Sequence, residues 1–226
     1  MISSIKSEVA KLLYCDNSGH GMEHIERVLT LSLKFAEKEN ADKTLTSLIA
    51  LLHDVDDYKL FGEENSKNLT NAKKIMNRCG VDDETQEKVC AEIMRIGYSK
   101  RLGGISPTTT EGKIVSDADM CDALGVNGII RAHKYSIKKG CEFFNKNIFP
   151  IQNVTEKKYK SQPASTTVCH AFEKLLKLKN LMLTNSGKSE AVERHNIIVE
   201  LLNHLFDEED ASEWKEYLKK FLDNLE

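Results

Sequence analysis

The stretch Leu48-Ile49-Ala50-Leu51-Leu52-His53-Asp54-Val55-Asp56-Asp57 joins an apolar run to a histidine and a carboxylate. Such a run is expected to be buried, and a buried carboxylate without a partner costs roughly several kcal/mol. A metal ion would satisfy both His53 and Asp54 if the backbone turns at a helix end. Alternatively, the helix dipole favours a histidine at the C-terminus and Asp54 simply begins a turn. For this pair alone, both interpretations stay open.

Amphipathic periodicity on both sides of this stretch predicts an all-α fold. Strand-like alternation is scarce, and Asp42 is a candidate N-cap for the helix that ends at His53. Cys79-Gly80 closes one helix, and Asp82 or Asp83 starts the next. Apolar residues recur at three- and four-residue spacing near 3–15, 21–39, 42–54, 65–79, 82–97, 109–124, 126–138, 165–184, 187–206 and 210–225.

Loops are expected at Lys100–Pro107 and between Lys139 and Pro163, where glycine and proline interrupt the helical pattern. The second loop could separate two subdomains, but the segment after it begins another amphipathic helix and has no linker-like composition. We therefore predict a single domain over residues 1–226.

Composition narrows the class of protein. The chain has 226 residues, a hydrophobic content of 40% and a formal net charge of -3, which together indicate a globular protein and argue against a general binder of nucleic acid or anionic membranes. The six cysteines form no CxxC pair, and the N-terminus lacks the apolar core of a signal peptide. No apolar run approaches the roughly 20 residues that cross a bilayer. We expect a cytoplasmic protein with reduced thiols.

A second group of polar residues precedes the first stretch. His20, His24 and Arg27 fall near one another at spacings of four and three, so one helical edge presents two imidazoles and a guanidinium. Taken alone, this edge also fits a solvated surface, since many histidines are only hydrogen-bonded.

A third group lies in the segment Glu111–Gly125. Asp117 follows Ile114 by three residues and precedes Cys121 by four, which places its carboxylate on an apolar stripe. A solvated face does not explain that position. Asp122 lies at the edge of the same stripe and could orient a ligand or a neighbouring helix, whereas Asp119 is expected to point elsewhere, exposed or capping.

The three groups together supply two imidazoles and two carboxylates, from His24, His53, Asp54 and Asp117. This mixed set suits one divalent ion among Mn, Fe, Co, Ni and Zn and is poor for Ca. It would leave positions open for water and substrate. Hydrolysis by a metal-bound water is the chemistry that such a site supports, because an ion lowers the pKa of its water to about 7 in favourable cases.

In this order, His24 with Arg27-Val28, then His53-Asp54, then Asp117 resemble the H…HD…D signature of the HD-domain phosphohydrolase superfamily. The surrounding sequences GHGMEHIERV, ALLHDVDDYK and EGKIVSDADMCDALGVNGIIRA are similar in particular to its small single-domain prokaryotic hydrolases. The resemblance continues in HAFEKLLKLKNLMLT and ERHNIIVELLNHLF and so covers most of the chain.

The resemblance implies an HD-domain helical fold with extra C-terminal helices and one divalent ion held by His24, His53, Asp54 and Asp117. It also implies hydrolysis of phosphate esters or anhydrides in a small phosphorylated molecule, with nucleotides as a substrate class. No nucleic-acid or membrane partner is expected.

Candidate catalytic roles follow from the same resemblance. Asp57 and Asp54 are candidates for moving a proton or holding the attacking water. Arg27 and Lys59 are candidates for binding phosphate, since charged donors match phosphate oxygens, and Arg27 would offset charge during the reaction. His20 is a further candidate for substrate contact.

The chain also departs from the family pattern. Gly21 stands where GHDxxH commonly has an acid, and Met120 and Cys121 replace the Arg and Leu of DADRLDA. Metal ligation is expected to survive, but Gly21 and Met120 motivate an alternative function, a non-catalytic metal-containing protein that binds nucleotide or phosphate. An oxygenase with two irons is disfavoured because residues 55–116 contain no histidine.

Overall fold

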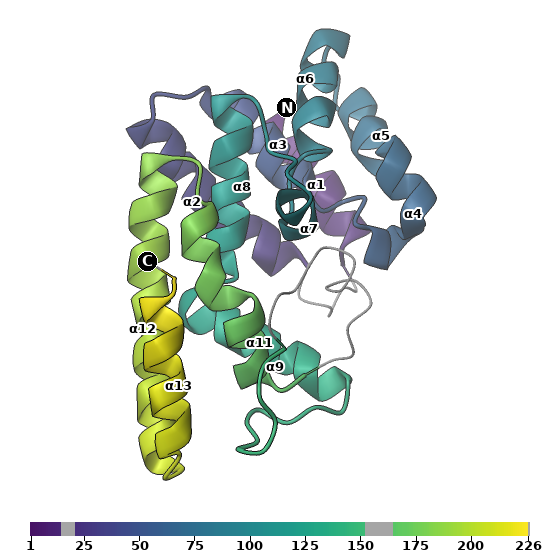
Figure 1. Cartoon of the computed structure of the whole chain (residues 1–226). Helices are drawn as coiled ribbons and strands as arrows, with labels where there is room; N and C mark the ends of the chain where they lie inside the picture. The colour runs from purple at the N-terminus through teal and green to yellow at the C-terminus, as the bar shows by residue number, and fades with distance from the viewer. Residues whose placement is uncertain (15–20, 152–164, 226) are drawn as a thin grey trace. The chain divides into compact units, whose positions relative to one another are not determined.

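The structure, a computed structural model, describes residues 1–14, 21–151 and 165–225. Within these ranges every regular element is a helix and no strand is present (Figure 1), which confirms the all-α prediction. No helix in this part of the chain is long and apolar enough to cross a membrane. The helices are α1 (Ile2–Leu12), α2 (Met22–Lys38), α3 (Lys43–Leu52), α4 (Tyr58–Asn68), α5 (Thr70–Arg78), α6 (Asp83–Ile93), α7 (Tyr98–Leu102), α8 (Thr110–Asp122), α9 (Gly125–Lys138), α11 (Thr167–Glu173), the 3-10 helix η1 (Leu175–Leu181), α12 (Asn185–Glu208) and α13 (Ser212–Asp223).

The predicted capping residues are found at the helix ends. The Asp42 carboxylate accepts hydrogen bonds from the backbone N–H groups of Thr44 and Leu45, at 2.7 and 3.0 Å, and so caps α3. Asp82 caps α6 in the same way. Gly80 follows α5 with a φ of 70°, a conformation that glycine adopts without strain.

Three boundaries differ from the prediction. Helix α4 begins at Tyr58, well before the expected start at 65, and is interrupted at Gly62, where φ is 84°. Helix α7 (Tyr98–Leu102) overlaps the start of the loop that was expected at Lys100–Pro107. The segment predicted as one helix over 165–184 bends at Lys174, where φ is -133° and ψ is -62°, and continues as η1. Short or broken helices such as these carry too few turns to leave a clear periodic signal.

The described chain forms two compact units. The first contains Met1–Asp122 and Leu183–Gly187, and the second contains Ala123–Met182 and Lys188–Glu226. The single domain expected over residues 1–226 stays a prediction.

Helix α3 is central to the first unit. It packs against α1, α2, α6 and α8, and α2 also packs against α8. All five residues of the apolar run Leu48–Leu52 are fully buried, as a central helix requires. The burial of α3 fixes where its C-terminal end, with His53, lies relative to α2 and α8.

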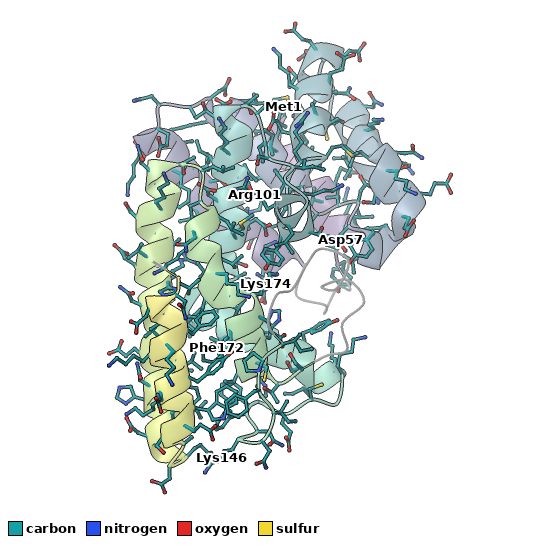
Figure 2. All side chains as sticks on the ribbon, in the orientation of Figure 1. Met1, Asp57, Arg101, Lys146, Phe172 and Lys174 are labelled. Carbon is teal, nitrogen blue, oxygen red and sulfur yellow. The ribbon has the colours of Figure 1, made fainter. Side chains whose placement is uncertain are left out.

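The second unit is built around aromatic side chains. The ring of Trp214 stacks on that of Phe149, with centroids 4.4 Å apart, and also contacts Phe172 and Phe206. Its indole N–H donates to the backbone carbonyl of Lys146 at 3.1 Å, which satisfies the buried polar atom. Phe172 and Lys146 are labelled in Figure 2. This cluster holds α11, α12 and α13 of the second unit together.

Candidate metal centre

Two buried imidazoles from α2 and α3 face each other in the first unit. His24 lies in the first turn of α2, and His53 follows the last residue of α3 as its C-cap. Their exposed fractions are 2% and 8%. The two Nε2 atoms are 3.3 Å apart.

Two carboxylates lie close to the same pair of nitrogens. Asp54 Oδ2 is 3.3 Å from Nε2 of His24 and 3.7 Å from Nε2 of His53. Asp119 Oδ1, from α8, is 3.5 and 3.9 Å from these two atoms. His24, His53 and Asp119 each offer one donor atom, and these atoms lie within 4.8 Å of one another. Donors from three packed segments therefore face a common point.

The hydrogen bonds of the two Nδ1 atoms indicate which kind of ligand the common point can bind. Nδ1 of His24 lies 2.7 Å from Asp122 Oδ2, and Nδ1 of His53 lies 2.8 Å from the carbonyl oxygen of Ala50. Both partners are acceptors, so each Nδ1 donates, and Nε2 is the nitrogen through which either ring, when neutral, would bind a metal. Two lone pairs and two carboxylates that face one another are favourable only around a positive charge.

The spacing of these atoms also suits one ion. Donors that share a metal at bond lengths of about 2.0–2.2 Å are themselves roughly 3–3.5 Å apart. The separations between the imidazole nitrogens and the carboxylate oxygens here are 3.3 to 3.9 Å. The mixed nitrogen and oxygen set fits the divalent transition metals expected from the sequence.

Asp122 supports the centre from α8. It is 1% exposed, and besides its contact with His24 it accepts hydrogen bonds from Arg27, at 2.6 Å to Nε and 3.0 Å to Nη2. These bonds raise the pKa of the Arg27 guanidinium. Asp122 thus fixes the orientation and tautomer of His24, the role of a carboxylate behind a metal-binding histidine.

The structure corrects the sequence prediction for α8: the carboxylate beside the imidazoles is that of Asp119 and not that of Asp117. Asp117 is fully buried, as predicted, but its oxygens accept from the backbone N–H of Leu183 at 2.9 Å and from the N–H and hydroxyl of Thr184 at 2.7 and 2.8 Å. Burial raises the pKa of Asp117, and these hydrogen bonds oppose the rise. The apolar stripe therefore faces the Leu183–Gly187 segment.

Asp119 lies two residues further along α8, about 200° around the helix, and is partly exposed. One signal in the sequence could have identified it. Asp119 precedes Asp122 by three residues, so the two share a face of the helix. Once Asp122 is assigned to His24, its neighbour one turn earlier is the natural ligand candidate.

Sequence reasoning also missed Asp56, which anchors the turn after His53-Asp54. Its buried carboxylate accepts hydrogen bonds from the backbone N–H groups of Asn71 and Ala72, both at 2.9 Å, at the start of α5. The Asn71 side chain donates to the carbonyl of Val55 at 2.8 Å. Burial raises the pKa of Asp56, and the two backbone hydrogen bonds oppose the rise.

The remaining predicted site residues lie nearby or outside the described part. Asp57 (labelled in Figure 2) ends the turn and is half-buried, and its backbone carbonyl accepts from the N–H groups of Leu60 and Phe61 in α4. Lys59 belongs to α4, but its side chain lies outside the described residues, as does all of His20. Their predicted substrate contacts stay predictions.

The three residues that depart from the family pattern are a helix cap and two core residues. Gly21 is the N-cap of α2, and its carbonyl accepts from the N–H of His24 at 2.9 Å. Met120 and Cys121 are buried in the core, with exposed fractions of 2% and 0%. None of the three supplies a donor atom to the centre.

Comparison with known proteins identifies the family of this chain. The model of the HD domain family matches residues 21–124, the segment that contains His24, His53, Asp54 and Asp119. The uncharacterized protein YpgQ of Bacillus subtilis is 30% identical over 203 residues, which cover 89% of this chain and 90% of that protein.

Solved structures match over nearly the whole chain. A protein from Lactobacillus plantarum is 32% identical, covers 95% of this chain and 97% of its own, and has a TM-score of 0.78. An HD-superfamily hydrolase from Bacillus thuringiensis is 31% identical over 93% of this chain and 97% of its own, with a TM-score of 0.71. YpgQ in complex with ADP is 27% identical over 92% of this chain and 94% of its own, with a TM-score of 0.68. With this match in sequence and fold, the chain belongs to the HD-domain superfamily.

Proposed function

We propose that this protein is a divalent-metal-dependent phosphohydrolase that acts on a small phosphorylated substrate, with a nucleotide as the favoured class. The observation that carries the proposal is the convergence of His24, His53, Asp54 and Asp119 on one point. A bound divalent ion would lower the pKa of a water and polarise a phosphoryl oxygen. The description of the Bacillus thuringiensis relative as a hydrolase supports the same class of reaction.

The ligands are proposed to be His24, His53, Asp54 and Asp119. His24 is locked by Asp122, and His53 is locked by the carbonyl of Ala50, so neither ring needs to reorient when the ion binds. Preorganised ligands of this kind keep the donor atoms in place during the reaction. Asp117, which accepts hydrogen bonds from Leu183 and Thr184, is assigned no place among the ligands.

Residues around the centre are proposed to act on the attacking water and to bind the phosphate. Asp57, beside the His53-Asp54 turn, is proposed to hold the attacking water or to accept its proton, together with Asp54. Arg27 donates to Asp122 through Nε and Nη2. Its other N–H groups are proposed to bind the phosphate, with Lys59 as a second cation, because a guanidinium matches phosphate oxygens in charge and geometry.

A nucleotide is favoured as the substrate class because YpgQ was crystallised in complex with ADP. The two proteins match over 92% of this chain and 94% of YpgQ. A nucleoside di- or triphosphate also offers the several phosphate oxygens that an ion, an arginine and a lysine can share.

The test measures the release of phosphate and pyrophosphate. Metal-free protein is supplied in turn with Mn²⁺, Fe²⁺, Co²⁺, Ni²⁺ or Zn²⁺ and assayed against nucleotides and sugar phosphates. Asp54→Asn and His53→Ala should lose bound metal and lower turnover by about a hundredfold or more. His204→Ala, which changes an exposed histidine of α12, serves as the matched control and should leave turnover unchanged. Full turnover by either site variant without metal would refute the proposal.

The alternative function, a non-catalytic protein that binds nucleotide or phosphate, predicts a different result. Nucleotides would raise the melting temperature of the metal-loaded protein, but no substrate would release phosphate with any of the five ions. The buried positions of Met120 and Cys121 weaken its motivation, because these departures change core packing and not the donor set.

A further inference from the structure

We propose that the Leu183–Gly187 segment is a positioning clasp that holds α8 and the end of α2 and thereby sets the geometry of the metal centre. The inference rests on the proposed metal site and adds positioning residues to it, above all Thr184 and Gly187. Although the residues on either side of this segment belong to the second unit, the segment itself packs with the first.

The contact with α8 is made by Asp117. This carboxylate is fully buried and accepts from the N–H of Leu183 through Oδ1, and from the N–H and hydroxyl of Thr184 through Oδ2. The Thr184 hydroxyl oxygen in turn accepts from the N–H of Gly187 at 3.0 Å. One carboxylate and one hydroxyl thus bind the segment to the helix, and charge-assisted bonds of this kind are among the stronger ones in proteins.

Gly187 is required by the closeness of the two chains. A Cβ atom at this position would lie 2.3 Å from Asp117 Oδ2 and 2.7 Å from its Cβ and Cγ atoms. The neighbouring Cys121 Sγ approaches the carbonyl of Gly187 at 3.8 Å. The segment therefore lies against α8 over one full turn, from Asp117 to Cys121, and any larger side chain would separate the two.

A second contact reaches the helix that carries His24. Glu39 directly follows α2, and its carboxylate accepts from the backbone N–H of Ser186 at 2.7 Å. The same five-residue segment is thus bound to α8, which presents Asp119 and Asp122, and to the C-terminal end of α2, whose first turn presents His24. His24 and Asp122 lie on these two helices, so the distance between them depends on how the helices are aligned.

The position of Asp119 links the clasp to the ion. Asp119 is two residues from Asp117 and faces about the opposite side of α8. A rotation of the helix that releases Asp117 must therefore move Asp119 relative to the imidazole nitrogens. Metal and catalytic sites tolerate misplacement of only about 0.5 Å before function suffers.

The experiment compares Mn²⁺ binding, followed by titration calorimetry and by the Mn²⁺ electron paramagnetic resonance spectrum, in four variants. Thr184→Val removes the hydroxyl but keeps the shape, Thr184→Ser restores it, and Gly187→Ala adds the obstructing Cβ. The matched control is Thr166→Val, because Thr166 is a buried threonine that caps α11 through the N–H of Cys169 at 3.1 Å.

Thr184→Val and Gly187→Ala are expected to weaken Mn²⁺ binding by about tenfold or more and to alter the spectrum. Thr184→Ser should bind within about twofold of the wild type, and Thr166→Val should lower the melting temperature without changing Mn²⁺ affinity. If Gly187→Ala does not fold, the Thr184 pair decides the question.

Wild-type affinity in Thr184→Val, at a loss of melting temperature equal to that of Thr166→Val, would overturn the clasp. A wild type that binds Mn²⁺ but releases no phosphate would refute the proposed function and leave the clasp supported by its own binding data. A wild type with no Mn²⁺ affinity would overturn both.

Discussion

Asp122→Asn is expected to weaken metal binding by about 10- to 100-fold, or about 1.4–2.8 kcal/mol of binding free energy. Asp122 Oδ2 lies 2.7 Å from Nδ1 of His24, and Oδ1 accepts from Nε of Arg27 at 2.6 Å. Asp122 Oδ2 also accepts from Nη2 of Arg27, so the single oxygen of asparagine can keep either Nε of Arg27 or the two donors at the Oδ2 position. We expect it to keep the 2.6 Å bond to Nε. The amide NH₂ group of the variant must then face Nδ1 of His24.

That change reverses the tautomer of His24. Nδ1 would have to accept a hydrogen bond, so the proton of the neutral ring would move to Nε2, which faces Nε2 of His53 at 3.3 Å. A protonated Nε2 cannot bind a metal. The alternative, keeping the proton on Nδ1 without an acceptor, forfeits a charge-assisted hydrogen bond of about 1.5–3 kcal/mol, which agrees with the expected loss of affinity.

The assay is calorimetric titration of metal-free protein with Mn²⁺ at pH 7.5. Asp82→Asn is a suitable control, because Asp82 is another hydrogen-bonded aspartate, the N-cap of α6, but is no part of the centre. Circular dichroism shows whether each variant is folded. If folded Asp122→Asn binds Mn²⁺ within about twofold of the wild type, the assigned role of Asp122 is wrong.

Two further predictions concern stability. Burial, chiefly, lowers the pKa of His195 to about 4, so the folded protein resists its protonation while the unfolded chain takes up a proton near pH 6.5. The unfolding free energy of the wild type should therefore fall between pH 7.5 and pH 5 by about 2 kcal/mol more than that of His195→Leu. Urea titrations at several pH values measure both, and an equal fall in the two proteins would contradict the reasoning. Gly112→Ala should lower the unfolding free energy by about 2–3 kcal/mol, since its Cβ would lie 2.0 Å from Oε2 of buried Glu92. The usual gain for Gly→Ala within a helix, about 1 kcal/mol, has the opposite sign, so the direction of the shift in melting temperature tests the reasoning.

Local signals in the sequence were enough for most helices and for three of the proposed ligands. The periodic segments and the caps Asp42 and Asp82 depend on residues close in the chain, and the structure shows both as expected. His24, His53 and Asp54 were identified by their resemblance to a short motif at helix ends, and the structure brings all three together. Such features need no knowledge of distant contacts.

Caps supplied from a distance could not be predicted in this way. Glu92 accepts hydrogen bonds from the backbone of Thr108 and Thr109, just before α8, and Asp56 does the same for Asn71 and Ala72 in α5. In both cases the acidic residue lies 15 to 17 positions from its partners. A local pattern search can find the cap that the Thr109 hydroxyl gives to the N–H of Gly112, but it cannot find these distant acceptors.

The carboxylates of α8 show why burial alone does not identify a metal ligand. Asp117 and Asp122 are both almost fully buried, yet each is satisfied by donors of the protein, the first by Leu183 and Thr184 and the second by Arg27 and His24. Asp119 is more exposed, and its carboxylate oxygen Oδ1 lies beside the two imidazole Nε2 atoms, which are the metal-binding nitrogens of neutral rings. An acid that faces acceptors needs a cation, whereas an acid that faces N–H groups is already neutralised. Because the donors for Asp117 come from residues 66 and 67 positions away, periodicity within α8 could place it inside the protein but could not tell which partner it meets.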